Sequence, residues 1–219
     1  DITSQKLNEE RLKHLAQYDP LTSLPNRRTF IERLRRVLTK RPARKGLAVL
    51  FLDLDHFKDI NDQWGHRAGD AFLQAVGARL RGSVRRSDLV ARWAGDEFAV
   101  MLNPVSGRHG AVRVARKILR TLRRPFAVLG RRTKVSASIG GCMLRGKASA
   151  EKLMAQADQA MYAVKKEGRD DILFWTPAVS LQHTSATSQR EAAAQAHSRT
   201  GTRRRPRQGG VQKTAIRTS

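Results

Sequence analysis

The stretch that most constrains how this 219-residue chain can fold is RRSDLVARWAGDEF, at residues 85–98. Two apolar runs, Leu89–Trp93 and Phe98–Leu102, flank the small pair Ala94-Gly95, which the acidic pair Asp96-Glu97 follows at once. A turn of small residues between two strand-like runs is typical of a β-hairpin. The sequence therefore predicts a hairpin with an acidic tip.

A second acidic pair, Asp53 and Asp55, ends the apolar run AVLFLDLD. Successive side chains of a strand point to opposite faces, so the odd-numbered residues from Val49 to Asp55 share one face and the even-numbered leucines share the other. Both acidic pairs thus lie where strands leave the core. Hard oxygen ligands, with Lys58 nearby, are what a Mg²⁺–triphosphate site needs.

The charge of the chain favours polyanionic partners. The formal net charge is +24, which attracts nucleoside triphosphates, nucleic acid or an anionic membrane surface, although an arginine-rich composition can also be a general bias without a function. The one cysteine, Cys142, excludes an internal disulfide and fits a reducing compartment, so we expect a cytoplasmic location. No run reaches the roughly 18 apolar residues of a membrane span. Because the chain does not begin with Met, we expect it to be part of a longer protein.

Three segments follow from periodicity and composition. Residues 1–17 carry leucines at roughly helical spacing, which indicates either a frayed terminus or a connector helix from the stalk of an upstream sensory module. Residues 18–175 have the apolar runs of one globular domain. Residues 176–219 are rich in Ser, Thr, Gln, Ala and Arg without apolar periodicity, and we expect this basic tail to be disordered.

Within residues 18–175 the patterns predict alternating helices and strands. The predicted elements are a helix starting at Leu24-Pro25 with Ser23 as its cap, a strand at Leu47–Asp53, a short helical turn broken at Gly65 and resumed as a helix at Ala68–Leu80, a helix from Ser106-Gly107 that Pro125 ends, strands at Phe126–Leu129 and Thr133–Met143, a helix capped by Ser149 and closed by Gly168, and a last strand at Ile172–Trp175. Polar residues crowd around the break at Gly65, among them Asn61, His66 and Asp70. We interpret this corner as a ligand-binding site, with a solvated helix–helix corner as the alternative.

Five separated motifs resemble those of GGDEF domains, the diguanylate cyclase family. They are DPLTSLPNR at 19–27, FLDLDHFKDINDQWGHRAGD at 51–70, RWAGDEF at 92–98, SIGG at 138–141 and ADQAMYAVKKEGRD at 157–170. The resemblance covers Tyr18 to Trp175. It implies an α/β palm-like fold, with a mostly antiparallel central sheet surrounded by helices, related to adenylyl cyclase catalytic domains.

The resemblance also implies a reaction. Members of the family join two GTP molecules into cyclic di-GMP and release two pyrophosphates, through in-line attack of a ribose 3′-hydroxyl on an α-phosphate. One domain holds one GTP, so two copies must face each other as a homodimer. The implied cofactor is Mg²⁺, with Mn²⁺ as a substitute.

The metal-binding and catalytic residues carry over from the motifs. Asp53 and Asp96 would hold the metal, with the backbone carbonyl of Leu54 and the carboxylate of Glu97 as further contacts. Asp96 or Glu97 would also help to deprotonate the 3′-hydroxyl.

The substrate and product contacts carry over in the same way. Asn61 and Asp70 would read the guanine edge, since a carboxylate accepts from a pair of donors that adenine lacks. The phosphates would contact Lys58, Lys165 and Arg169, and Gly95 would let the backbone approach the nucleotide. The predicted inhibitory product site consists of Arg85, Asp88 and Arg116.

Two positions depart from the family pattern. Ala94 replaces the first glycine of the hairpin motif, which would cost about 1 kcal/mol if that position required a positive φ. Asp170 stands where Asn is usual. Alongside the cyclase we therefore keep a second hypothesis, a catalytically silent domain that binds cyclic di-GMP or GTP. A third, a nucleic-acid binder, rests on charge alone and is the weakest.

Overall fold

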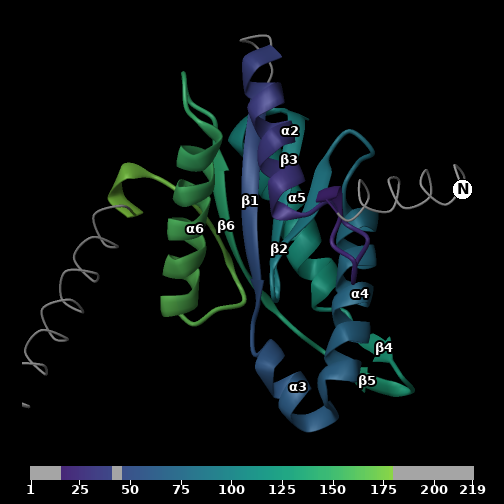
Figure 1. The fold of residues 1–219 in the computed structure, drawn as a ribbon. Helices are drawn as coiled ribbons and strands as arrows, with labels where there is room; N and C mark the ends of the chain where they lie inside the picture. The colour runs from purple at the N-terminus through teal and green to yellow at the C-terminus, as the bar shows by residue number, and fades with distance from the viewer. Residues whose placement is uncertain (1–15, 41–45, 180–219) are drawn as a thin grey trace, which may run out of the picture. The chain divides into compact units, whose positions relative to one another are not determined.

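The computed structural model describes residues 16–40 and 46–179, and Figure 1 shows them built around one central sheet. The sheet has five strands in the order β2-β3-β1-β6-β7, antiparallel except for the parallel pair β6–β7. Its strands are β1 (Gly46–Leu54), β2 (Leu89–Ala94), β3 (Glu97–Val105), β6 (Ala137–Met143) and β7 (Ile172–Phe174). The helices are α2 (Arg27–Lys40), α3 (Phe57–Trp64), α4 (His66–Ser83), α5 (Gly107–Leu122) and α6 (Ala150–Lys166), and a small antiparallel pair joins β4 (Phe126–Val128) to β5 (Arg131–Thr133).

The alternation of β1 divides the apolar core into two layers. Leu50, Leu52 and Leu54 pack with residues of α4 and α5 on one face of the sheet. Val49 and Phe51 pack with residues of α2 and α6 on the other face. Figure 1 shows this arrangement, with α2 and α6 in front of the sheet and α4 and α5 behind it. The predicted fold class and the predicted parity of this strand are confirmed.

Two local predictions about helix and strand limits are wrong. Helix α2 begins at Arg27, and its N-terminal cap is Asn26, whose Oδ1 accepts a hydrogen bond of 3.0 Å from the backbone N–H of Thr29. Ser23 instead has a φ of 55°, inside a turn that precedes the helix. The predicted strand over 133–143 is two strands in different sheets, because the chain leaves β5 at Thr133 and enters β6 only at Ala137.

The cap of α6 is confirmed, since Ser149 Oγ accepts a hydrogen bond of 3.1 Å from the N–H of Lys152. Helix α6 then lies unusually close to the sheet at Gly140. A Cβ at that position would overlap the backbone of Ala157 and Met161. The close approach explains the glycine of the SIGG motif, and it brings the last turn of α6 to the end of β1.

The predicted stalk and tail fall mostly outside the described residues. Only Ala16 and Gln17 of the connector are described, and both are helical. The tail beyond residue 179 is outside as well. Within the two described ranges, no helix has the length and apolar character needed to cross a bilayer.

Candidate active site

The predicted hairpin is β2–β3, and its tip lies beside the end of β1. Asp53 in β1 pairs with Glu97 in β3 in the antiparallel register, and the backbone N–H of Leu54 donates to the carbonyl of Asp96 at 3.4 Å. The carboxylates that the sequence placed at two separate strand ends, Asp53, Asp96 and Glu97, therefore meet where β1 ends and β3 begins. We call this end of the sheet the carboxylate edge. This edge is the lower end of β1 in Figure 1, where the chain enters α3.

Lys165 reaches this edge from the last turn of α6. Its Nζ lies 2.6 Å from Asp53 Oδ2, and both side chains are largely buried. Burial raises the pKa of Asp53, the charge of Asp96 raises it further, and the ammonium of Lys165 opposes both effects. The sequence assigned Lys165 to phosphates, and the structure adds this direct contact with a predicted metal ligand.

Glu97 has a further acidic neighbour that the sequence did not single out as a site residue. Burial raises the pKa of Glu97, and the negative charges of Asp53, Asp158 and Asp96 add to this effect. Asp158 lies on α6, seven residues before Lys165 and so two turns away on the same side of the helix. This two-turn spacing between Asp158 and Lys165, within the motif at 157–170, is the sequence feature that could have identified Asp158 as a site residue.

The residues present fit a divalent cation. Burial is the main reason that the pKa values of Asp53 and Glu97 are raised, and the neighbouring carboxylates, Asp96 among them, add to both shifts. Bound positive charge would relieve this repulsion. Carboxylate oxygens are also the ligands that hard cations prefer. In the described ranges, no three acidic, histidine or cysteine side chains converge as a ready-made cation cage.

We expect the Glu97→Gln variant to be more stable against unfolding than the parent protein at neutral pH. In acid, the difference in stability should disappear. Because the pKa of Glu97 is higher in the folded state than its ordinary value of 4.5, the folded state binds this proton more tightly than the unfolded chain does. Stability is therefore lost as pH rises from 4.5 through the raised pKa. Thermal unfolding of both proteins between pH 4 and 7 measures this, with the exposed Glu167→Gln as control. A Glu97→Gln advantage that does not depend on pH would contradict the prediction.

Asp55 has a different role from Asp53, although the two share one strand pattern. It is buried, and its carboxylate accepts hydrogen bonds from Ser136 Oγ (2.6 Å), Ser138 Oγ (2.7 Å) and the backbone N–H of Asp170 (3.1 Å). It therefore ties the end of β1 to β6 and to the segment after α6. Asp55 is a structural residue that holds the ends of these elements together.

The hairpin is anchored by a pair that the sequence did not identify. Arg92 Nη1 lies 3.1 Å from Asp19 Oδ1, and Arg92 Nε donates to the carbonyl of Gly95 at 2.9 Å. Gly95 has a φ of 47°, the left-handed region that glycine adopts most easily. Ala94 is exposed and is not among the residues of positive φ. The alanine in the first motif position therefore causes no backbone strain.

The polar corner at Gly65 is the α3–α4 junction. Asn61 on α3 packs against Gly69 on α4, where a Cβ would overlap its Oδ1, and Asp70 is the next residue, exposed on α4. The two residues predicted to read guanine thus lie at one corner. Their contact with a base stays a prediction.

Gly69→Ala is expected to weaken GTP recognition without loss of the fold. The added methyl must displace the Asn61 side chain, which is a flexible group, while Ala is the better helix former. We expect the KM for GTP to rise about tenfold, the effect of losing one hydrogen bond to the base. Gly82→Ala is the matched control, because its Cβ would meet nothing within 4 Å on the same helix. Equal KM values for the two variants would contradict the role of Asn61.

The other two predicted phosphate contacts are exposed. Lys58 lies in the first turn of α3, and Arg169, with a φ of 66°, follows α6. No hydrogen bond or ion pair of either side chain is found in the part of the chain that the structure describes. Their roles stay predictions.

The Arg85–Asp88 segment is a tight turn between α4 and β2. The buried Asp88 accepts hydrogen bonds from the backbone N–H of Arg85 (3.0 Å) and of Asn103 (3.2 Å), and Arg81 donates to the carbonyls of Arg85 and Asp88. Asp88 therefore shapes the turn. The guanidinium of Arg85 is exposed, with no bond to another described residue.

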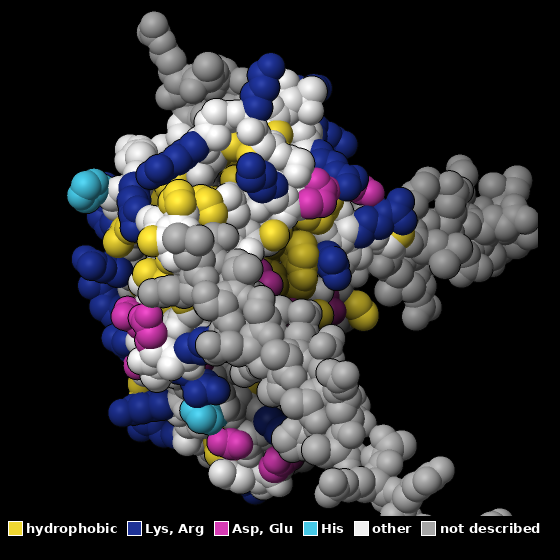
Figure 2. Space-filling model, turned by 90° about the vertical axis from the view of Figure 1, so that its left-hand side faces the viewer, with side chains coloured by type: hydrophobic (Ala, Val, Ile, Leu, Met, Phe, Trp, Pro, Cys, Tyr) yellow, Lys and Arg dark blue, Asp and Glu magenta, His cyan; other side chains and the backbone are white. Residues whose placement is uncertain are grey.

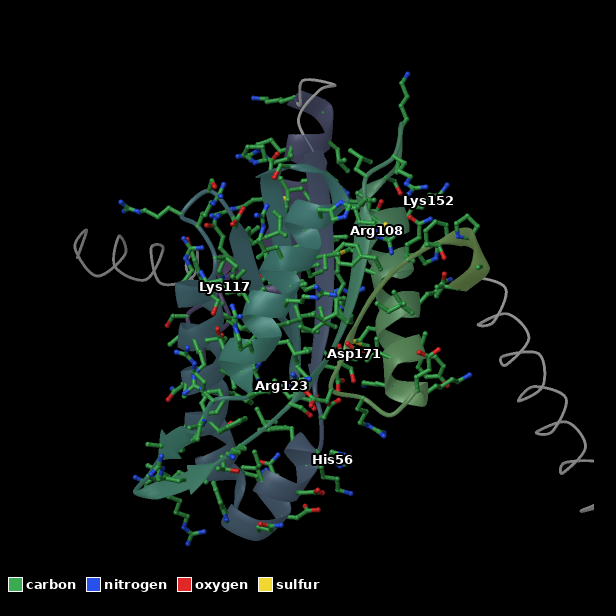
Figure 3. The ribbon with its side chains drawn as sticks, turned by 180° about the vertical axis from the view of Figure 1, so that it is seen from behind. His56, Arg108, Lys117, Arg123, Lys152 and Asp171 are labelled. Carbon is green, nitrogen blue, oxygen red and sulfur yellow. The ribbon has the colours of Figure 1, made fainter. Side chains whose placement is uncertain are left out.

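Arg116 does not lie beside this turn. It lines a cavity on the side of α5 that faces β7. Lys117 shares a face of α5 with Thr121, whose carbonyl accepts from Arg79 of α4, and Figure 3 shows Lys117 on that side. The predicted third member of the product site therefore stays a prediction without a supporting contact.

The family model for the diguanylate cyclase GGDEF domain matches residues 16–171. The chain belongs to the GGDEF family. Diguanylate cyclase TpbB of Pseudomonas aeruginosa is 44% identical over 161 residues, which cover 72% of this chain and 37% of TpbB. The cyclic di-GMP phosphodiesterase NbdA of the same species is 37% identical over 187 residues, which cover 84% of this chain and 24% of NbdA.

Solved structures agree with this membership. The GGDEF domain of TpbB superposes with a TM-score of 0.74 at 40% identity, covering 77% of this chain and 99% of that one. The coiled coil and GGDEF domain of DgcB from Caulobacter crescentus, in complex with cyclic di-GMP, gives 0.71 at 25% identity, covering 79% and 93%. This GGDEF chain thus spans much less than two thirds of the full-length relatives TpbB and NbdA.

Proposed function

We propose that this GGDEF domain is a diguanylate cyclase that condenses two GTP molecules into cyclic di-GMP and two pyrophosphates. The observation that carries the proposal is the meeting of Asp53, Asp96, Glu97 and Lys165 at the hairpin tip. Asp53, Leu54, Asp96 and Glu97 would hold Mg²⁺, or Mn²⁺ in its place, and the bound cation supplies charge neutralisation at the phosphate.

The chain's own residues position the reactants. Asn61 and Asp70 orient the guanine, and Lys58, Lys165 and Arg169 hold the phosphates. Asp96 or Glu97 would help to deprotonate the 3′-hydroxyl, since both carboxylates lie at the hairpin tip. One domain offers one such site, so the attacking hydroxyl must come from the GTP of a second copy.

The test is turnover of GTP with Mg²⁺, with the products separated by chromatography at several protein concentrations. We expect cyclic di-GMP and pyrophosphate, and a rate per domain that rises with concentration as homodimers form. No product at any concentration would refute the cyclase. A rate per domain that is independent of concentration would refute catalysis between two copies that associate freely.

Arg85→Ala is expected to relieve product inhibition. The exposed Arg85 guanidinium, on a turn fixed by Asp88, is suited to bind a phosphate of cyclic di-GMP. The initial rate should be unchanged, while the concentration of added product that halves the rate should rise about tenfold or more. Arg86→Ala, the exposed neighbour, serves as control. If both variants are inhibited like the parent, the product site lies elsewhere.

The second candidate is a silent regulatory module. It is favoured by the likeness to NbdA, a relative named for phosphodiesterase activity. Calorimetric titration with cyclic di-GMP and GTP, in a protein that makes no product, separates a receptor from an inactive remnant. In either case we place the domain in a cytoplasmic part of a longer signalling protein with an upstream sensory module, and we propose no nucleic-acid partner.

A further inference from the structure

A second basic site lies at the β7 edge of the sheet. A surface cavity of about 490 Å³ lies between α5 and β7. Its lining includes Arg108, Arg116, Arg120 and Arg123 on the α5 side and Asp171 on the β7 side. Figure 3 shows Arg108 on α5 and Arg123 just after the end of that helix, with Asp171 opposite, just before β7. None of these side chains belongs to the carboxylate edge described above.

The helical repeat places the four arginines on one side of α5. Successive arginines are eight, four and three residues apart, which correspond to about two, one and one turns. They therefore lie on one face of the helix. Arg123 is neutralised by Asp170, with Nε 2.8 Å from Oδ1. Arg108 stands over the ring of Phe174 at 5.7 Å, and Arg116 and Arg120 have no bonded partner in the described ranges.

The unpaired positive charges of the cavity favour an anionic ligand. Three unpaired guanidinium groups, those of Arg108, Arg116 and Arg120, face one carboxylate, Asp171, and so leave a surplus of two positive charges. A guanidinium fork binds the oxygens of a phosphate in pairs. The buried Leu119 and Phe174 form an apolar wall that strengthens these charge interactions, since it keeps water from one side.

Basic side chains around the cavity increase its attraction for anions. A second cavity of about 220 Å³ shares Arg108 and Phe174 with the first and is also lined by Arg145, Lys147 and Lys152. Figure 2 shows that Lys and Arg side chains predominate over acidic ones along the left-hand margin of the face it presents. The segment 180–219 is itself basic, with RRRPR at 203–207, so it is a poor occupant for this cavity.

We propose that the α5–β7 cavity binds a diphosphate group, either inorganic pyrophosphate or the polyphosphate tail of a nucleotide. Two directly linked phosphates present their oxygens together to the guanidinium forks of Arg116 and Arg120, whereas the two phosphodiesters of cyclic di-GMP are held apart by ribose. Asp171 repels the phosphates toward Arg116 and Arg120. This site does not depend on the proposed cyclase activity.

The test is calorimetric titration of the whole chain with inorganic pyrophosphate, at about 0.15 M salt and with a chelator present so that no cation bridges pyrophosphate to the carboxylate edge. Arg120→Ala is the main variant, and Arg113→Ala is the matched control, because Arg113 is an exposed α5 arginine that does not line the cavity. We expect Arg120→Ala to weaken binding about tenfold, the loss of one charge-assisted pair, and Arg113→Ala to weaken it less than about twofold. No binding by the parent, or equal losses in both variants, would overturn the proposal.

Two more titrations identify the source of the diphosphate. Tighter binding of GTP than of pyrophosphate, again weakened by Arg120→Ala, would assign the site to a nucleotide, and equal binding would assign it to pyrophosphate. Cyclic di-GMP is expected to bind this cavity, measured as the binding that Arg120→Ala weakens in an Arg85→Ala background, more weakly than either. If cyclic di-GMP binds as tightly and is weakened equally by Arg120→Ala, the diphosphate assignment is wrong. These titrations measure no turnover, so their failure leaves the cyclase proposal untouched.

Discussion

Asp96→Asn is expected to lower the rate of cyclic di-GMP formation on the order of 100-fold or more, while the protein stays folded. Asp96 lies at the hairpin tip, and its charge already raises the pKa of Asp53. Removing that charge relieves repulsion in the metal-free protein but replaces a charged carboxylate ligand by a weaker, neutral amide oxygen. The measurement is GTP turnover beside thermal unfolding, and we expect lost activity with unchanged or slightly higher thermal stability.

Asp158→Asn is the matched control for this loss. It makes the same change of charge beside Glu97, on a residue to which we assign no metal contact. We expect it to retain most activity. If the two variants lose activity equally, the effect comes from the general field of the acidic cluster, and Asp96 has no special role as a ligand.

Asp55→Asn is expected to destabilise the domain by about 2–4 kcal/mol, because an amide cannot accept from three donors in place of a buried carboxylate. Whichever way the amide turns, its NH₂ group faces at least one of these three donors, so the tie between the end of β1, β6 and the segment after α6 is weakened. Denaturant unfolding measures the loss. GTP turnover at low temperature, where the variant is folded, should also fall, since Lys165 precedes that segment.

Asp59→Asn is the control for Asp55→Asn, since Asp59 is exposed on α3 and its contact with His56 spans 3.7 Å between exposed side chains. Such pairs contribute little to stability, so we expect a change below about 1 kcal/mol. Similar losses in the two variants would mean that the hydrogen bonds of Asp55 are not the reason for its burial.

The sequence alone determined the features that depend on local repetition. The alternation of β1 set which residues enter each core layer, because a strand has a fixed period of two. The small turn between two apolar runs predicted the hairpin, and the acids at both strand ends predicted Asp53, Asp96 and Glu97 as one site. The five motifs identified the family without any knowledge of strand order.

Only the tertiary structure decided how distant segments meet. It brought Lys165 to Asp53 and Arg92 to Asp19, and it turned Asp55 toward β6 and away from the predicted site. It also placed Arg116 on the β7 side of α5. These contacts join residues far apart along the chain, and a pattern of neighbours cannot predict them because they depend on which helix packs on which face of the sheet and at what rotation.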